Sequence, residues 1–433
     1  LILVLGMAVD ANILINERIR DEARQGKGAW LSLDNGFRRA YGTILDSNIT
    51  TLIAISLLFM MGSGPIRGFA VTMGIGLLTS LFTAVAVNRV MMEWVVRRRA
   101  RQPLIIRGLP MLDKFGEQFS SGRRVISFMK AGTTALIVSA VLSIASLGLM
   151  AKPGLNYGID FSGGALLEIR TPDTSIETLR TQLAGAGLVD ISVQALSGDG
   201  EQSWLLRQAI QENIDGGSQM ETLRGTVKSV LPEASIDRAE LVGPRVSGDF
   251  TDMSILAVML AGAGMLLYLW YRFENHFAMA AVLTIALDLT KTIGFFVLTG
   301  IEFNLTAIAA LLALIGYSVN DKVVVFDRMR ESMRVRPDQP LEQIVNRSIS
   351  ATLTRTTYTS LSTLVAVLPM AVAGGSAVAS FAVPMLFGII VSTSSSIFIA
   401  APIVLLLGRR RQRLGLPQLR PLESARTQLP HQV

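Results

Sequence analysis

Three ionisable residues stand in apolar stretches of this sequence, where charged side chains are costly. Asp10 and Asp321 each lie in a run of residues apolar enough to cross a bilayer, and Arg355 lies at the entry to another. A carboxylate at the bilayer centre costs about 2.5–3.5 kcal/mol on insertion scales, so such a residue usually marks a proton, ion or ligand site. A neighbouring cation and desolvation shift the pKa of a carboxyl group in opposite directions. An acid beside an intramembrane arginine can therefore load a proton from one side and release it to the other.

The alternative is structural, because buried acids can also hold helices together by hydrogen bonds. A second candidate set follows the same logic. Asp288 and Lys291 are one turn apart in a later apolar stretch, which favours an ion pair on one helix face. Asn320 precedes Asp321 directly and is the third secondary candidate. We expect no cofactor and no metal site, because the chain has no cysteine and only two histidines, one of them in the C-terminal tail.

An internal repeat connects the acid-bearing segments. GMAVDANILINERIRDE at 6–22 matches GYSVNDKVVVFDRMRES at 316–332, with Asp10 on Asn320. The match continues from 62–80 to 374–392 and from TTLIA to STLVA. Both copies have a basic cluster after the acid-bearing helix, so they have the same orientation. This pattern predicts a parallel repeat about an axis along the membrane normal.

The apolar stretches predict an α-helical polytopic membrane protein with about nine spanning helices. Half of the 433 residues are hydrophobic and 17% are charged. A short amphipathic stretch, with Phe37, Tyr41 and Ile44 at helical spacing, precedes the second span. The first residue, Leu1, already lies in a helical pattern, and we interpret the chain as a fragment that lacks earlier helices. The predicted spans are 1–16, 49–62, 68–96, 131–150, 253–272, 277–298, 303–326, 356–373 and 379–408.

The polar segment 152–252 has the alternation of a small soluble domain. Its strands are predicted at 164–170, 190–196, 202–209 and 235–242, and its amphipathic helices at 175–187 and 218–231. The order β-α-β-β-α-β predicts a ferredoxin-like α+β fold.

The net charge of +7 is concentrated in short clusters beside the apolar runs. Under the positive-inside rule these clusters place the C-terminus in the cytoplasm and the soluble domain on the opposite side of the membrane. Nucleic-acid binding is not indicated, because no compact basic domain contains interleaved aromatic residues. The segment 101–130 is expected to be a basic cytoplasmic linker, and 411–433 a disordered tail.

At these residues the chain resembles the SecD and SecF proteins of bacterial protein export, which belong to the resistance-nodulation-division superfamily. AVDANILINERIR at 8–20 is similar to the fourth membrane helix of SecD. GIDFSGG at 158–164, VGPRVSGD at 242–249 and GYSVNDKVVVFDRMRE at 316–331 are similar to SecF motifs. SecD-like sequence covers a three-helix part at 1–100. SecF-like sequence covers the rest to 410, as a first helix at 131–151, the periplasmic domain at 152–252 and a five-helix part at 253–410.

The resemblance implies an accessory subunit of the SecYEG translocon, not an enzyme, in which proton flow drives export of preproteins. It implies that Asp10, Asp321 and Arg355 form the proton path. Two positions depart from the family pattern: Lys322 stands where a small hydroxyl residue is usual, and LDLTK at 287–291 lacks the usual histidine before the acid. A cation at 322 would favour ionisation of Asp321 unless its side chain points away.

Two other functions remain as alternatives. A proton-coupled exporter of lipids or small molecules in the same superfamily would need large periplasmic domains, and the soluble domain here has only about a hundred residues. An intramembrane aspartyl protease would use Asp10 and Asp321 as a dyad, but the sequence around them lacks the Tyr-Asp and Gly-x-Gly-Asp patterns of that family.

Overall fold

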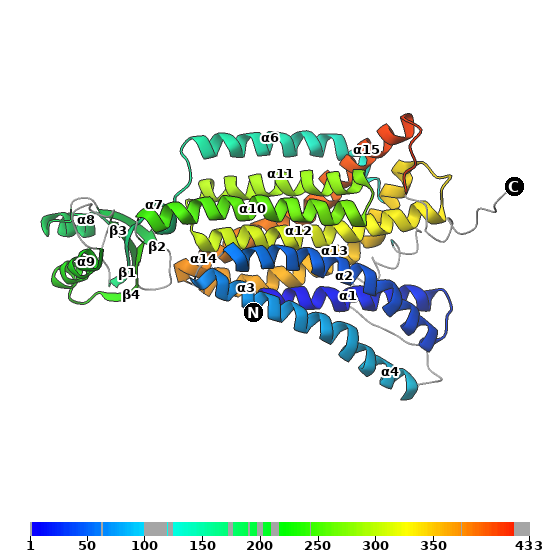
Figure 1. Cartoon of the computed structure of the whole chain (residues 1–433), viewed down its shortest axis with the longest axis horizontal. Helices are drawn as coiled ribbons and strands as arrows, with labels where there is room; N and C mark the ends of the chain where they lie inside the picture. Colours follow the sequence, from blue (N-terminus) through cyan, green and yellow to red (C-terminus); the bar gives the residue numbers. More distant parts are fainter. Residues whose placement is uncertain are drawn as a thin grey trace.

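The computed structural model consists of a bundle of long, roughly parallel helices with a small α/β domain at one end (Figure 1). The end of the bundle next to this domain is called the domain end, and the opposite end, with the arginine clusters, the basic end. The described residues are 2–61, 64–98, 119, 124–171, 176–188, 191–196, 202–208, 216–242, 244–373 and 375–419. Most of the linker and the end of the tail lie outside these residues, as does Gly243 of the VGPRVSGD motif.

Within the described residues, eight helical segments are long and apolar enough to cross a membrane. A ninth long helix, α1, contains too many charged residues to meet this criterion, but it packs along α2 and α13 inside the bundle. The bundle helices are α1 (Ile2–Arg24), α2 (Ala29–Met61), α3 (Gly64–Phe82), α4 (Asn88–Arg98), α6 (Gly132–Ala151), α10 (Pro244–Arg272), α11 (Asn275–Thr299), α12 (Leu305–Val335), α13 (Leu341–Ala373), α14 (Gly375–Ser395) and α15 (Ala401–Arg413).

Several helices are longer than the apolar runs predicted. The amphipathic stretch and the second span form one helix, α2, because no Pro interrupts the helical pattern before the apolar run, and Gly36 and Gly42 stay within the helix. Phe37 and Ile44 are buried against α1, while Tyr41 is exposed. Similarly, α12 continues past 326 to Val335 and α13 starts at Leu341. The polar turns at the ends of these helices lie outside the apolar run, so the hydropathy pattern does not detect them.

The two halves pack on each other in a repeat-related way. Helix α1 packs on α13, and its counterpart α12 packs on α2. The close approach requires glycine at matching positions: a Cβ at Gly6 would lie 3.2 Å from Thr363, and one at Gly316 would lie 3.2 Å from Thr51. The repeat-related Phe69 and Phe381 meet edge to face with ring centroids 5.2 Å apart.

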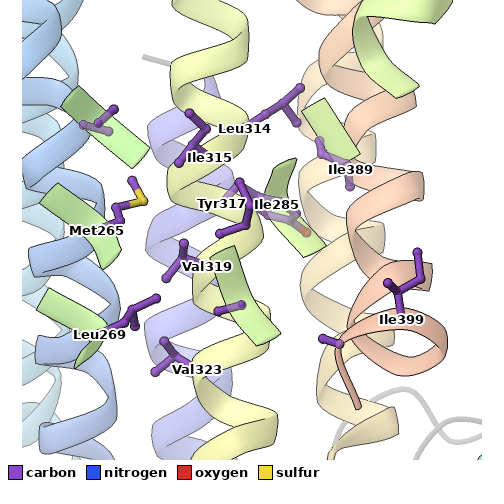
Figure 2. Packing of buried hydrophobic residues seen from close by; sticks show 14 of the residues in the cluster. Met265, Leu269, Ile285, Leu314, Ile315, Tyr317, Val319, Val323, Ile389 and Ile399 are labelled. Carbon is purple, nitrogen blue, oxygen red and sulfur yellow. The ribbon is translucent and has the colours of Figure 1, made fainter. Parts of the chain in front are cut away.

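Helix α12 occupies the centre of the bundle. In its most apolar window 83% of the residues are buried, against 17% in α6 at the periphery. Figure 2 shows aliphatic residues of α12, such as Ile315, Val319 and Val323, packed among neighbouring helices. The helix that carries Asp321 is therefore surrounded by protein and not by lipid.

The last spanning helix of each half contains a π-helical segment, at Thr83–Val87 between α3 and α4 and at Ser396–Ala400 between α14 and α15. Such segments are often found at functional sites, because the extra residue redirects the side chains of one turn. Ser395 and Ser396, at the second segment, are fully buried and face the bundle interior.

The α/β domain contains β1 (Gly164–Thr171), α8 (Ile176–Gly185), β2 (Ile191–Leu196), β3 (Gln202–Gln208), α9 (Gly216–Val230) and β4 (Ser235–Val242). Its four antiparallel strands have the order β2-β3-β1-β4, which is the ferredoxin-like arrangement predicted from sequence. Leu167, Ile169 and Leu206 on the sheet are fully buried against Leu179 and Leu223 of the two helices.

Candidate functional site

Asp10 of α1 forms a polar cluster between the two halves of the bundle. Its Oδ1 accepts a hydrogen bond from Arg355 Nη2 of α13 at 2.9 Å, and its Oδ2 accepts one from Asn320 Nδ2 of α12 at 2.5 Å. Asp10 and Arg355 are 8% and 5% exposed. The repeat relates Asp10 to Asn320, so these two side chains meet where the halves meet. The structure therefore brings three of the six predicted site residues into direct contact.

Asp321 lies beside this cluster on α12. Its Oδ1 accepts a hydrogen bond from Thr356 Oγ1 of α13 at 2.8 Å, and its Oδ2 is buried with no hydrogen-bond partner among the described residues. Asn320 with Asp321 on α12 thus faces Arg355 with Thr356 on α13. A protease dyad that shares one proton needs a hydrogen bond between its two carboxyl groups. No hydrogen bond joins the carboxylates of the described residues Asp10 and Asp321.

A second buried cluster surrounds Asp288 of α11. The predicted ion pair with Lys291 is present, with Nζ and Oδ1 3.1 Å apart. Lys322 of α12 also reaches Asp288, with Nζ 3.3 Å from Oδ2, and Ser395 donates to the same oxygen. Lys322 is fully buried and points away from Asp321. The sequence left its direction open because helical residues one position apart lie about 100° apart around the axis.

Removing one partner of such a buried pair leaves an unpaired charge, which costs about 3–5 kcal/mol. Arg355 beside Asp10, and the two lysines beside Asp288, neutralise charges that the apolar surroundings would otherwise oppose. The side-chain partners of Asp321 are the neutral hydroxyls of Thr356 and Ser396, and the cations Lys322 and Arg355 act on it without a hydrogen bond. Asp321 thus differs from the two other buried acids in having no cation among its hydrogen-bonded partners.

Thr356 and Ser395 were not predicted as ligands of the acids, and Lys322 was considered only as a neighbour of Asp321. The signal for Thr356 is its place next to Arg355 in a hydroxyl-rich run. Ser395 is brought to Asp288 by the turn that precedes the π-helical segment, which no periodicity predicts. The described residues contain no group of three or more histidine, aspartate or glutamate side chains arranged to hold a metal ion.

The α/β domain is joined to the start of α12 by a set of polar contacts. Backbone hydrogen bonds of 2.8 Å link Gly158 N to Phe303 O and Phe303 N to Asn156 O. Asp160 accepts a hydrogen bond from Leu305 N, the first residue of α12, at 2.9 Å. A carboxylate at this position stabilises the N-terminus of a helix. The segment that carries the GIDFSGG motif is therefore fixed to the helix that carries Asp321.

Glu302 completes this joint. Its Oε2 lies 3.1 Å from Nη2 of Arg207 on β3, and Arg207 Nη1 also donates to Asn156 Oδ1 at 3.0 Å. Burial raises the pKa of Glu302 above its ordinary value, although Arg207 and Arg238 oppose the shift. Burial likewise raises the pKa of Asp160, against the lowering effect of its hydrogen bond from Leu305.

Comparisons with protein-family models agree with this architecture. Residues 222–410 match the model "Protein export membrane protein SecD/SecF, C-terminal", and residues 148–171 match "SecD/SecF GG Motif". Residues 1–103 match the MMPL family.

Curated and solved relatives extend the match over almost the whole chain. SecDF of Brucella abortus is 38% identical over 412 residues, which is 94% of this chain and 53% of that protein. SecF of Desulfurispirillum indicum is 39% identical over 307 residues, which is 69% of this chain and 96% of that protein. The crystal structure of SecDF from Thermus thermophilus superposes with a TM-score of 0.84 at 33% identity, over 94% of this chain and 54% of that one.

The chain spans about half the length of the SecDF relatives that it matches. It nevertheless covers almost all of the Desulfurispirillum indicum SecF at an identity well above 30%. The chain therefore belongs to the SecD/SecF family of protein-export membrane proteins.

Proposed function

We propose that this chain is the proton-conducting part of an accessory subunit of the Sec translocon, which uses the proton gradient to promote export of preproteins. Its partners are SecYEG and the exported chains, and no enzymatic step is required. The observation that carries the proposal is the cluster of Asp10, Arg355 and Asn320 between the two halves, with Asp321 beside it. The relatives named SecDF and SecF support the assignment to protein export.

In this proposal Asp321 is the group that changes its protonation state. When Asp321 is ionised, it competes with Asp10 for the guanidinium of Arg355, since Thr356 holds Asp321 next to that arginine along α13. When Asp321 is protonated, Arg355 returns to Asp10. Each proton that passes therefore switches Arg355 between Asp10 on α1 of the first half and Asp321 on α12 of the second half. This switch shifts the two halves relative to each other.

The joint at the domain end transmits this shift. Asp321 lies 16 residues beyond Leu305, or about 24 Å along α12 at 1.5 Å per residue. Because Asp160 and Phe303 fix the α/β domain to the start of α12, a movement of α12 along its axis moves the domain. The domain end is the periplasmic side in this proposal, and the basic end is the cytoplasmic side of the inner membrane, consistent with the positive-inside rule.

The test is proton-gradient-dependent secretion in cells whose only copy of the full-length protein carries Asp321→Asn. This variant keeps the hydrogen-bonding shape but cannot ionise, and secretion should fall to the level seen with a collapsed gradient. The matched control is Glu342→Gln, which removes a half-exposed carboxylate at the basic end and should secrete normally. Normal secretion by correctly inserted Asp321→Asn would contradict the proposal.

A further inference from the structure

A polar cavity of about 510 Å³ opens at the basic end of the bundle, where α1 and α2 of the first half meet α12 and α13 of the second. Six arginines and three acidic residues line it. It is distant from the α/β domain and takes no part in the function proposed above. Its excess of positive charge needs an explanation, because like charges in a partly enclosed space repel each other.

The acids of the cavity are already neutralised. Each has at least one cationic partner within 4.0 Å, so none is available for the remaining arginines. These pairs are Glu331 with Arg18 and Arg328, Glu22 with Lys27 and Arg39, and Asp21 with Arg24. The surplus positive charge is therefore located on the other wall of the cavity.

That wall is formed by the end of α12 and the start of α13. Arg336 and Arg347 are half-buried, and neither has a carboxylate partner among the described residues. Arg347 lies close enough to Arg336 and to Arg328 for electrostatic repulsion. Ser332 adds a hydroxyl group to the same wall. Two guanidinium groups and a hydroxyl are the donors that proteins use to bind phosphate, since each guanidinium offers two parallel N–H groups.

We propose that this cavity binds a phosphate-bearing anion through Arg336 and Arg347, and that the anion is the headgroup of an acidic phospholipid. The position argues for a lipid source, because the cavity lies at the ends of spanning helices, at the level of the headgroups. Basic pockets between helices on this side of a membrane bind anionic headgroups. The bound phosphate would offset the repulsion between the arginines and link the α12–α13 connection to the wall that α1 forms.

The experiment uses the full chain, purified and delipidated in neutral detergent, and measures retention of phosphatidylglycerol by native mass spectrometry. Phosphatidylcholine and inorganic phosphate are the two comparison probes. The test variant is Arg336→Gln with Arg347→Gln. The matched control is Arg410→Gln with Arg413→Gln, which removes the same charge from exposed positions on α15 at the same end. A third variant, Arg336→Lys with Arg347→Lys, retains the charge and shows whether a loss of binding in the test variant comes from misfolding.

Each basic side chain near an anionic surface contributes about 1 kcal/mol, or roughly fivefold in affinity, so the test variant should bind phosphatidylglycerol about 30-fold more weakly. The control should change less than twofold, and the lysine variant should retain most of the binding. If inorganic phosphate binds with the same dependence and the lipid does not, the phosphate site stands and its ligand is soluble. Equal losses in the test and control variants, or no binding of either probe to the native chain, would overturn the proposal.

Discussion

The ion pair between Asp10 and Arg355 predicts a strong energetic coupling across the two halves of the bundle. Its atoms are 2.9 Å apart and both side chains are buried. Two unit charges about 4 Å apart in an effective dielectric constant of 20 attract each other by about 4 kcal/mol. Asp10→Asn leaves the guanidinium unpaired and Arg355→Gln leaves the carboxylate unpaired, so each should lower the free energy of unfolding by about 3–5 kcal/mol.

The double variant removes both charges and should cost far less than the sum of the two single changes, by about 3 kcal/mol or more. The measurement is a double-mutant cycle, with free energies of unfolding taken from tryptophan fluorescence during titration of detergent micelles with sodium dodecyl sulfate. The control cycle uses Arg409 and Glu342, 2.6 Å apart but half-exposed, which should couple by less than about 1 kcal/mol. Additivity within about 0.5 kcal/mol at Asp10 and Arg355 would refute the buried pair.

Three further predictions concern packing, hydrogen bonding and pH. Gly36→Ala should destabilise the protein by about 1–3 kcal/mol in thermal unfolding, because the new Cβ would lie 2.8 Å from backbone atoms of Ile19. The control is Gly42→Ala on the same helix, where the new Cβ has open space. It should be neutral or up to about 1 kcal/mol stabilising. Thr356→Val removes the hydroxyl that donates to Asp321 and should lower the free energy of unfolding by about 1–3 kcal/mol, while Thr356→Ser should retain most of it. Because burial raises the pKa of Glu302 and Asp160, the folded state binds more protons than the unfolded state just above their ordinary pKa values, so the free energy of unfolding falls as pH rises through this window. The double variant Glu302→Gln with Asp160→Asn should show a smaller fall when its unfolding is measured as a function of pH. An unchanged slope would contradict this assignment.

Hydropathy and motif spacing predicted much of the fold. The four strands of the α/β domain begin and end within one residue of their predicted bounds, because alternating apolar residues and turn residues mark each of them. The helix ends were less predictable. Hydropathy detects the apolar part of α13 from 356, whereas the helix starts at Leu341 with a polar, amphipathic turn that packs on its neighbours.

The contacts of the site depend on information that is not local in sequence. The repeat aligns Asp10 with Asn320, but only the packing of the two halves shows that these side chains meet. The partner of Lys322 could not be predicted, since its direction depends on how α12 is rotated against α11 and on the position of Ser395 before the π-helical segment. Likewise, the contact of Asp160 with the first turn of α12 joins residues 145 positions apart, and no spacing rule predicts it.

The central claim is that protons cross the bundle through Asp321. The most direct test reconstitutes the full-length protein in liposomes that contain a pH-sensitive dye and applies a pH difference. The native protein should acidify the lumen at least tenfold faster than Asp321→Asn, while Glu342→Gln matches the native rate. Equal rates for the native protein and Asp321→Asn, with both folded and oriented alike, would contradict the account.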